Sequence, residues 1–273
     1  MAIISIAREI ASLGEETAQE LARITGYSLI DKDYIEQKLN AIGIDADKRE
    51  RYDEKNPGFW ASLSQHRDDY LHYLKTTILD AAQGNNCILM GRGAYAILRG
   101  TPNMLAIKLT APLAVRLERV KKAFGCDNKQ ALQIIEQSDH DRAGFHKYFF
   151  STNWMDSREY DLTINTGTTD PHHAAVAIAA LLDVLIDKEK EELGIQKIAD
   201  LSLAQAVVTE IVYVRKVPVH FLEATVEKGS VILHGVANSQ AAIDNAIAAT
   251  HGVSGVQNVE SAIQLVQEFT VMP

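Results

Sequence analysis

Residues 3–17 decide the fold of this chain, and they read IISIAREIASLGEET, from Ile3 to Thr17. The pattern predicts a short apolar strand, a tight loop and the start of a helix, a place where backbone N–H groups can surround a phosphate. Such a loop needs several glycines, a Lys at the helix start and a Ser or Thr hydroxyl for Mg²⁺. Here one glycine, Gly14, remains, and Glu15 and Glu16 stand where the other two are expected. The stretch therefore predicts a phosphate loop with an altered grip.

Strand and helix signals alternate along the first two-thirds of the chain. The expected strands are Ile3–Ala7, Tyr27–Ile30, Cys87–Met90, Met104–Leu109 and Tyr160–Asn165. The expected helices are Glu15–Ile24, one that starts at Asp31, Ser62–Ala82, Leu113–Phe124, Asp127–Ser138, Asp139–Phe150 and one from Asp170 through Ile186, with an irregular segment at Asn40–Gly58. This order predicts an α/β fold with a five-stranded parallel sheet and helices on both faces. Ligands bind at the carboxyl ends of such strands, where Arg8, Asp31, Arg92 and Asn165 fall.

Composition limits the class of protein. The chain has 273 residues, 47% of them apolar, and a formal net charge of −9. The charge argues against binding nucleic acid or an anionic membrane surface. No segment reaches the length of a membrane span, the first residues do not form a signal peptide, and Cys87 and Cys126 make no metal pattern. No metal site is predicted at His140, His146 or His172-His173, and a cytoplasmic location is expected.

The last third of the chain predicts a second, smaller domain. A charged run begins at Asp187 and predicts a linker over residues 188–197 between domains at 1–187 and 198–273. An α-β-β-α-β order is expected after it. Its elements are a helix at Ile198–Val214, strands at His220–Glu227 and Ser230–Ala237, a helix at Asn238–Thr250 and a strand at Val256–Val266. This order is that of a compact α+β domain without a catalytic cluster.

Several ordered motifs in residues 1–187 resemble the cytidylate kinase-like family, a branch of the P-loop nucleoside monophosphate kinases. The matching stretches are residues 7–18, 29–35, 88–94, 111–120 and 139–166. The first loop of the family runs approximately S-R-E-F-G-S-G-G-R-E-I-A, against AREIASLGEETA from Ala7 to Ala18 here. Residues 198–273 resemble a BON domain, through the stretches 224–237 and 252–259.

The departures from the family lie in the loop. Two glycines of the family are replaced by Ala11 and Leu13, and its basic residue by Glu15. Side chains at Ala11 and Leu13 hinder the close approach of a phosphate to the backbone. A carboxylate about 4 Å from a phosphate charge costs on the order of 4 kcal/mol at an effective dielectric constant of 20, before solvent and Mg²⁺ reduce it.

The resemblance also implies site residues. Arg92 and Arg142 are the implied catalytic residues, Arg92 on the acceptor monophosphate and Arg142 in the lid, where it meets the transferred phosphoryl group. The implied nucleotide-binding residues are Arg8, Ser12, Gly14, Thr17, Asp31, Gly91, Arg92, Gly93, Arg116 and Arg119. Other roles stay open for some of these: Arg116 and Arg119 are often solvent-facing or paired, and Asp31 is a good helix cap.

The sequence leaves three functions open. The leading expectation is a kinase-like protein with weak or lost activity, which senses a nucleotide, regulates or acts as a scaffold. The second is a working (d)CMP kinase that uses ATP and Mg²⁺, and the third is a purely structural assembly protein. BON domains are thought to bind lipids or mediate interactions; residues 198–273 hold three Lys/Arg against seven Asp/Glu, which favours a protein partner or a second copy over anionic lipid. A homo-oligomer is therefore expected.

Overall fold

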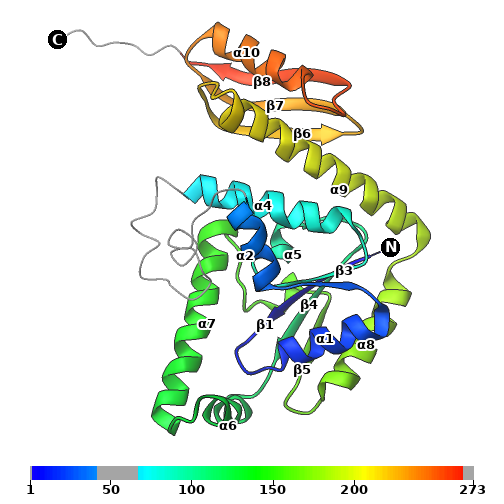
Figure 1. The fold of residues 1–273 in the computed structure, drawn as a ribbon, viewed down its shortest axis with the longest axis vertical. Coiled ribbons are helices and arrows are strands. Elements are labelled where there is room, and N and C mark those ends of the chain that lie inside the picture. The colour runs from blue at the N-terminus through cyan, green and yellow to red at the C-terminus, as the bar shows by residue number, and fades with distance from the viewer. Residues whose placement is uncertain (1, 42–66, 267–273) are drawn as a thin grey trace, which may run out of the picture. The chain divides into compact units, whose positions relative to one another are not determined.

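The computed structural model describes residues 2–41 and 67–266, and the chain forms two compact units, Met1–Gly194 and Ile195–Pro273. Figure 1 shows both units as ribbons. The irregular segment expected at Asn40–Gly58 lies almost entirely outside the described residues, as do the first five residues of the helix expected at Ser62–Ala82. Each unit has its own sheet and its own core, and the two are described in turn.

The first unit contains the expected five-stranded parallel sheet. Its strands are β1 (Ile3–Arg8), β2 (Ser28–Ile30), β3 (Cys87–Met90), β4 (Met104–Thr110) and β5 (Leu162–Asn165), in the order β2-β3-β1-β4-β5. The register pairs Ile6 with Met90 on one side of β1 and Arg8 with Leu109 on the other. The carboxyl ends of β1, β3 and β4 therefore meet at one edge of the sheet.

Helices cover both faces of this sheet. They are α1 (Gly14–Thr25), α2 (Lys32–Ala41), α4 (Arg67–Gln83), α5 (Ala94–Ile97), α6 (Leu113–Phe124), α7 (Asn128–Phe150) and α8 (Pro171–Leu185), with a short 3-10 turn, η2, at Ser157–Glu159. On one face, α1 and α8 pack side by side over an apolar core that includes Leu21, Ile107 and Ile178. On the other face, Ala7 and Ala106 pack against Tyr95, Trp154 and Tyr160. The expected capping residues are confirmed at Gly26 and Asp170.

Two expectations about helix boundaries in this unit are wrong. One continuous helix, α7, replaces the two expected at Asp127–Ser138 and Asp139–Phe150. Asp139 resembles an N-cap in the sequence, but no Gly or Pro interrupts the chain there, and its side chain pairs with Arg116 instead. The last strand begins at Leu162 rather than Tyr160, because the η2 turn precedes it and the Tyr160 side chain joins the core.

The second unit has the expected α-β-β-α-β order. Its elements are α9 (Lys188–Val208), a π-helical turn η3 (Thr209–Val214), β6 (Val219–Glu227), β7 (Ser230–Ala237), α10 (Gln240–His251) and β8 (Asn258–Leu265). Strand β7 is central, antiparallel to β6 and parallel to β8. Val231 and Leu233 face the core as expected, and Ser239 caps α10.

The segment expected to be a linker, residues 188–197, is the first half of α9. The helix begins at Lys188 rather than Ile198, because Asp187 caps its first turn and nothing in the charged run breaks a helix. Strand β6 carries a bulge between His220 and Glu223, which leaves the Phe221 side chain 87% exposed. Gly235, opposite the bulge, has a φ of +153°, and a Cβ there would lie 2.9 Å from Val219.

Candidate phosphate-binding site

The loop between β1 and α1 keeps a glycine-like backbone without the glycines. Ala11 and Leu13 have φ angles of 59° and 57°, in the left-handed region, and Leu13 is the residue that precedes α1. For residues with a Cβ this conformation costs about 1–2 kcal/mol each. Other contacts must therefore hold the loop in this shape.

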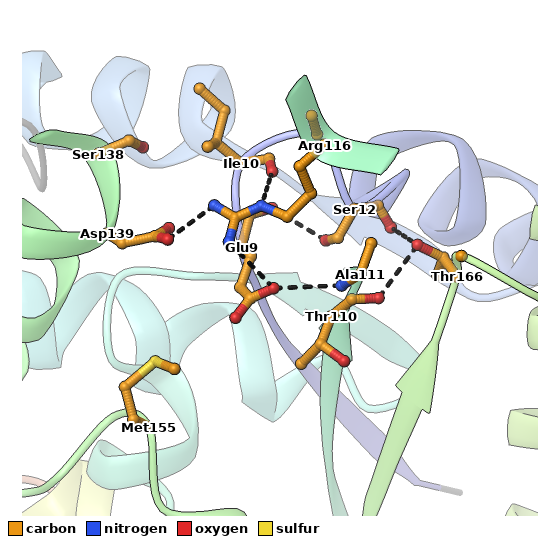
Figure 2. Close-up of polar contacts among 12 residues, drawn as sticks. Glu9, Ile10, Ser12, Thr110, Ala111, Arg116, Ser138, Asp139, Met155 and Thr166 are labelled. Atoms are coloured by element: carbon orange, nitrogen blue, oxygen red, sulfur yellow. Dashed lines mark hydrogen bonds and ion pairs between the residues drawn. The ribbon is translucent and has the colours of Figure 1, made fainter. Parts of the chain in front are cut away.

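The first of these contacts is a buried ion-pair network behind the loop. The Arg116 guanidinium, on α6, donates to the Ile10 carbonyl over 2.9 Å and pairs with the carboxylates of Glu9 at 3.3 Å and Asp139 at 2.7 Å (Figure 2). Glu9 also accepts the backbone N–H of Ala111 at 3.1 Å. The network ties the loop to α6, α7 and the end of β4.

A second set of contacts holds the middle of the loop. Arg119 donates to the Ala11 carbonyl at 3.0 Å and to the Thr166 carbonyl at 2.7 Å. The Thr166 hydroxyl lies 2.9 Å from the Ser12 carbonyl and 3.2 Å from the Thr110 carbonyl, so it bridges the loop and β4 (Figure 2). Together with Arg116, these groups fix the backbone that the missing glycines would otherwise allow.

The front of the loop carries an internal ion pair. The Arg8 guanidinium donates to one Glu15 carboxylate oxygen from Nε at 3.2 Å and from a terminal nitrogen at 3.1 Å. Gly14 is needed here, because a Cβ on it would lie 2.6 Å from Cγ of Arg8. Glu15 belongs to the first turn of α1, where backbone N–H groups favour an anion.

The pKa of Glu15 shows how well this position holds a negative charge. Burial alone would raise the pKa, but the charge of Arg8, hydrogen bonds from the Glu15 backbone N–H and from Arg8, and the charge of Arg142 together lower it. The side chain is 65% exposed, so solvent weakens each of these effects. A carboxylate of the protein itself therefore occupies the anion position at the start of α1.

A narrow pocket opens beside this ion pair, at the carboxyl ends of β1 and β3. Its lining residues are Ser5, Ile6, Ala7, Arg8, Gly91, Gly93, Tyr95, Arg142, His146 and Trp154. The space measures about 240 Å³ and includes open solvent. Because small-molecule sites usually measure about 300–1,000 Å³, the pocket suits a phosphate group with part of its nucleoside rather than a whole dinucleotide.

The structure brings only some of the implied site residues to this pocket. Arg8, Gly91, Gly93 and Arg142 line it. Arg142 is buried on α7 and donates to the Ser138 hydroxyl. These four residues come from β1, from the turn after β3 and from the helix that the resemblance assigns to the lid.

The other implied residues have contacts elsewhere. Arg92 is buried and donates to Glu36 on α2 at 3.2 Å, and Asp31 caps α2 by accepting the N–H of Tyr34. The Ser12 and Thr17 hydroxyls are buried and donate to the backbone carbonyls of Glu9 and Leu13. Arg116 and Arg119 hold the loop from behind, as described above.

One basic residue near the pocket was missed from the sequence. Lys108 lies in the middle of β4, only 2% exposed, and its ammonium donates to the Trp154 carbonyl at 2.6 Å. Burial lowers the pKa of Lys108 to about 8. The signal that could have found it is a lone Lys inside the apolar run MLAIKLT of an interior strand.

The comparisons with known proteins agree with this geometry. The model of the cytidylate kinase-like family matches residues 3–168, and that of the BON domain matches residues 199–267. The chain belongs to the cytidylate kinase-like family. The fold of its first unit is that of the P-loop kinases.

Individual relatives carry the same name. A cytidylate kinase of Thermoplasma acidophilum is 25% identical over 68% of this chain and 95% of its own length. One of Methanopyrus kandleri is 29% identical over 40% of this chain, which spans 61% of that relative. An uncharacterized protein of Eubacterium ventriosum, with a solved structure, has a TM-score of 0.52 at 24% identity over 67% of this chain and 99% of its own.

The family implies ATP and Mg²⁺, and the loop of this chain does not fit a triphosphate as the family loop would. The Glu15 carboxylate already occupies the anion position of α1, and the Thr17 hydroxyl is buried against its own helix. Among residues 2–41 and 67–266, no three His, Cys, Asp or Glu side chains are grouped to hold a metal. Over the same residues, no helix is long and apolar enough to cross a membrane.

Proposed function

We propose that the first unit binds a nucleoside monophosphate in the pocket of Arg8 and Arg142 and transfers phosphate to it weakly or not at all. The observation that carries this proposal is the Glu15 carboxylate on Arg8, because it places a negative charge where a donor phosphate would bind. Phosphoryl transfer depends on positioning and charge neutralisation, so a like charge at this point opposes it. The relatives named cytidylate kinase favour CMP or dCMP as the ligand.

The experiment measures both binding and turnover. We expect CMP to raise the thermal stability of the protein, and ADP release from ATP with CMP to be far below the roughly 1–100 s⁻¹ of ordinary kinases. Glu15→Arg, which restores the residue of the family, should raise the affinity for ATP by about tenfold, since it removes one like charge and adds an attractive one.

Glu16→Arg is the matched control. It makes the same change in charge on the next residue of α1, and the described contacts give Glu16 no ion pair with Arg8. We expect a much smaller gain in ATP affinity from it. Turnover by the wild type in the ordinary kinase range would overturn the weak-transfer proposal, and equal gains from both variants would refute the role of Glu15.

We also propose that the second unit mediates self-association, as part of a regulatory or scaffolding role. Strand β6 is an edge strand, and its bulge exposes Phe221, an arrangement that edge strands often use in pairing. Light scattering of the full chain should give a mass above that of a monomer, and Phe221→Ser should lower it. Identical masses for the two proteins would contradict this contact. The cytoplasmic location stays a prediction.

A further inference from the structure

Lys108 occupies a position where a charge is costly. It lies on β4, between β1 and β5, and shares a sheet face with Ala106, Trp154 and Tyr160. Lysines are rarely this buried unless a carboxylate pairs with them. A buried Lys in an otherwise apolar strand therefore requires an explanation.

The contacts of Lys108 do not neutralise its charge. Its Nζ donates to the Trp154 carbonyl and lies 3.6 Å from the Met155 sulfur, 4.1 Å from the Trp154 ring centre and 5.5 Å from that of Tyr160. Among residues 2–41 and 67–266, no carboxylate lies within 4.0 Å of it. The nearest acidic groups in the network, Glu9 and Asp139, pair with Arg116 instead.

Two features connect this ammonium to the pocket. Lys108 is the register partner of Ala7, which lines the pocket, and the Trp154 ring that it contacts lines the pocket as well. Tyr160, the second ring over Lys108, packs at 4.9 Å against Tyr95, another lining residue. The charge of Lys108 thus lies one layer of side chains below the pocket.

We propose that Lys108 is a positioning residue for the anionic group bound in this pocket, and that its charge compensates in part for the basic residue that the loop has lost to Glu15. The ammonium acts from behind the wall formed by Trp154, while Arg8 and Arg142 make the direct contacts. This inference rests on the proposed function, because it concerns the same pocket.

The titration of Lys108 makes the inference testable. Burial lowers its pKa to about 8, although the charges of Glu9 on the loop and Asp139 on α7 raise it; the charge of Arg116 on α6 lowers it further. The side chains facing Lys108 from the segment after α7 are Trp154 and Tyr160, which carry no charge near neutral pH. Above pH 8 the ammonium becomes neutral, so the affinity of the pocket for an anion should fall.

The experiment measures the affinity of the full chain for CMP and for sulfate between pH 7 and 9.5, a range in which neither probe changes its charge. We expect wild-type affinity to fall about tenfold across this range, the scale of one charge interaction in a protein. Lys108→Met should bind about tenfold more weakly at pH 7, with a flat pH profile. Lys108→Arg, which stays charged, should restore affinity and also give a flat profile.

Each outcome separates the two proposals. Measurable binding with a flat wild-type profile would overturn the role of Lys108 and leave the proposed function standing, and this readout does not depend on whether a variant folds. If Lys108 only pins the Trp154 segment, Lys108→Met weakens binding but the wild-type profile stays flat. If the wild type binds neither CMP nor sulfate, both proposals are wrong.

Discussion

The loop after β1 and the turn after β3 lie next to each other, joined by the hydrogen bond from the Gly91 N–H to the Ile6 carbonyl. Both contain residues in the left-handed region. In the turn, Gly91 and Gly93 have φ angles of 69° and 71°, and glycine makes this conformation easy. In the loop, Ala11 and Leu13 adopt the same region with side chains attached.

The difference teaches that a phosphate loop can keep its shape after losing its chemistry. The turn after β3 is specified locally, by its glycines. The loop after β1 is specified from outside, by Arg116, Arg119 and Thr166, which lie more than 90 residues further along the chain. The front of the loop is released from that constraint, and there Glu15 has replaced a basic residue. The predictions below test these two ways of holding a turn.

The largest effect is expected from Arg116→Met, which removes the support behind the loop. The change leaves the buried Glu9 carboxylate without its partner and releases Asp139, so the free energy of unfolding should fall by about 3–5 kcal/mol. Urea unfolding followed by tryptophan fluorescence measures it, since Trp60 and Trp154 both lie in the first unit.

Arg23→Met is its control. Arg23 pairs with Glu20 on the surface of α1 and its side chain is 67% exposed, so its loss should change stability by less than about 1 kcal/mol. Equal losses from Arg116→Met and Arg23→Met would show that the network does not hold the loop.

Gly93→Ala tests the turn that depends on glycine. A Cβ at this position would lie 2.1 Å from Cε2 of the Phe150 ring, and the φ of +71° is strained for alanine. Together these effects should reduce the free energy of unfolding by about 3 kcal/mol. Gly100→Ala is the matched control: its φ is +79° but nothing lies within 4 Å, so about 1 kcal/mol is expected. If the two losses are the same, packing against Phe150 contributes nothing.

The sequence predicts the local features of this molecule better than the distant ones. Short apolar runs identify the five strands, and Gly26, Asp170 and Ser239 mark helix ends, because these signals depend on neighbouring residues. The sequence alone could not show that Asp139 pairs with Arg116, and it therefore divided α7 into two helices. The same limit hid Lys108, since its neighbours on the sheet face, Trp154 and Tyr160, follow about 50 residues later.

The smallest effect is expected from Ala11→Gly, which gives the loop back one glycine of the family. Glycine relieves the cost of the 59° φ angle, but it loses more entropy on folding and removes a methyl group that packs beside Val120 and Ala131. These effects nearly cancel, and we expect the free energy of unfolding to change by less than about 0.5 kcal/mol. Ala22→Gly, within α1, is the control and should cost about 1 kcal/mol, the ordinary penalty for glycine inside a helix. Equal losses from the two variants would mean that Ala11 is not strained, and that the loop differs from the turn after β3 in sequence only.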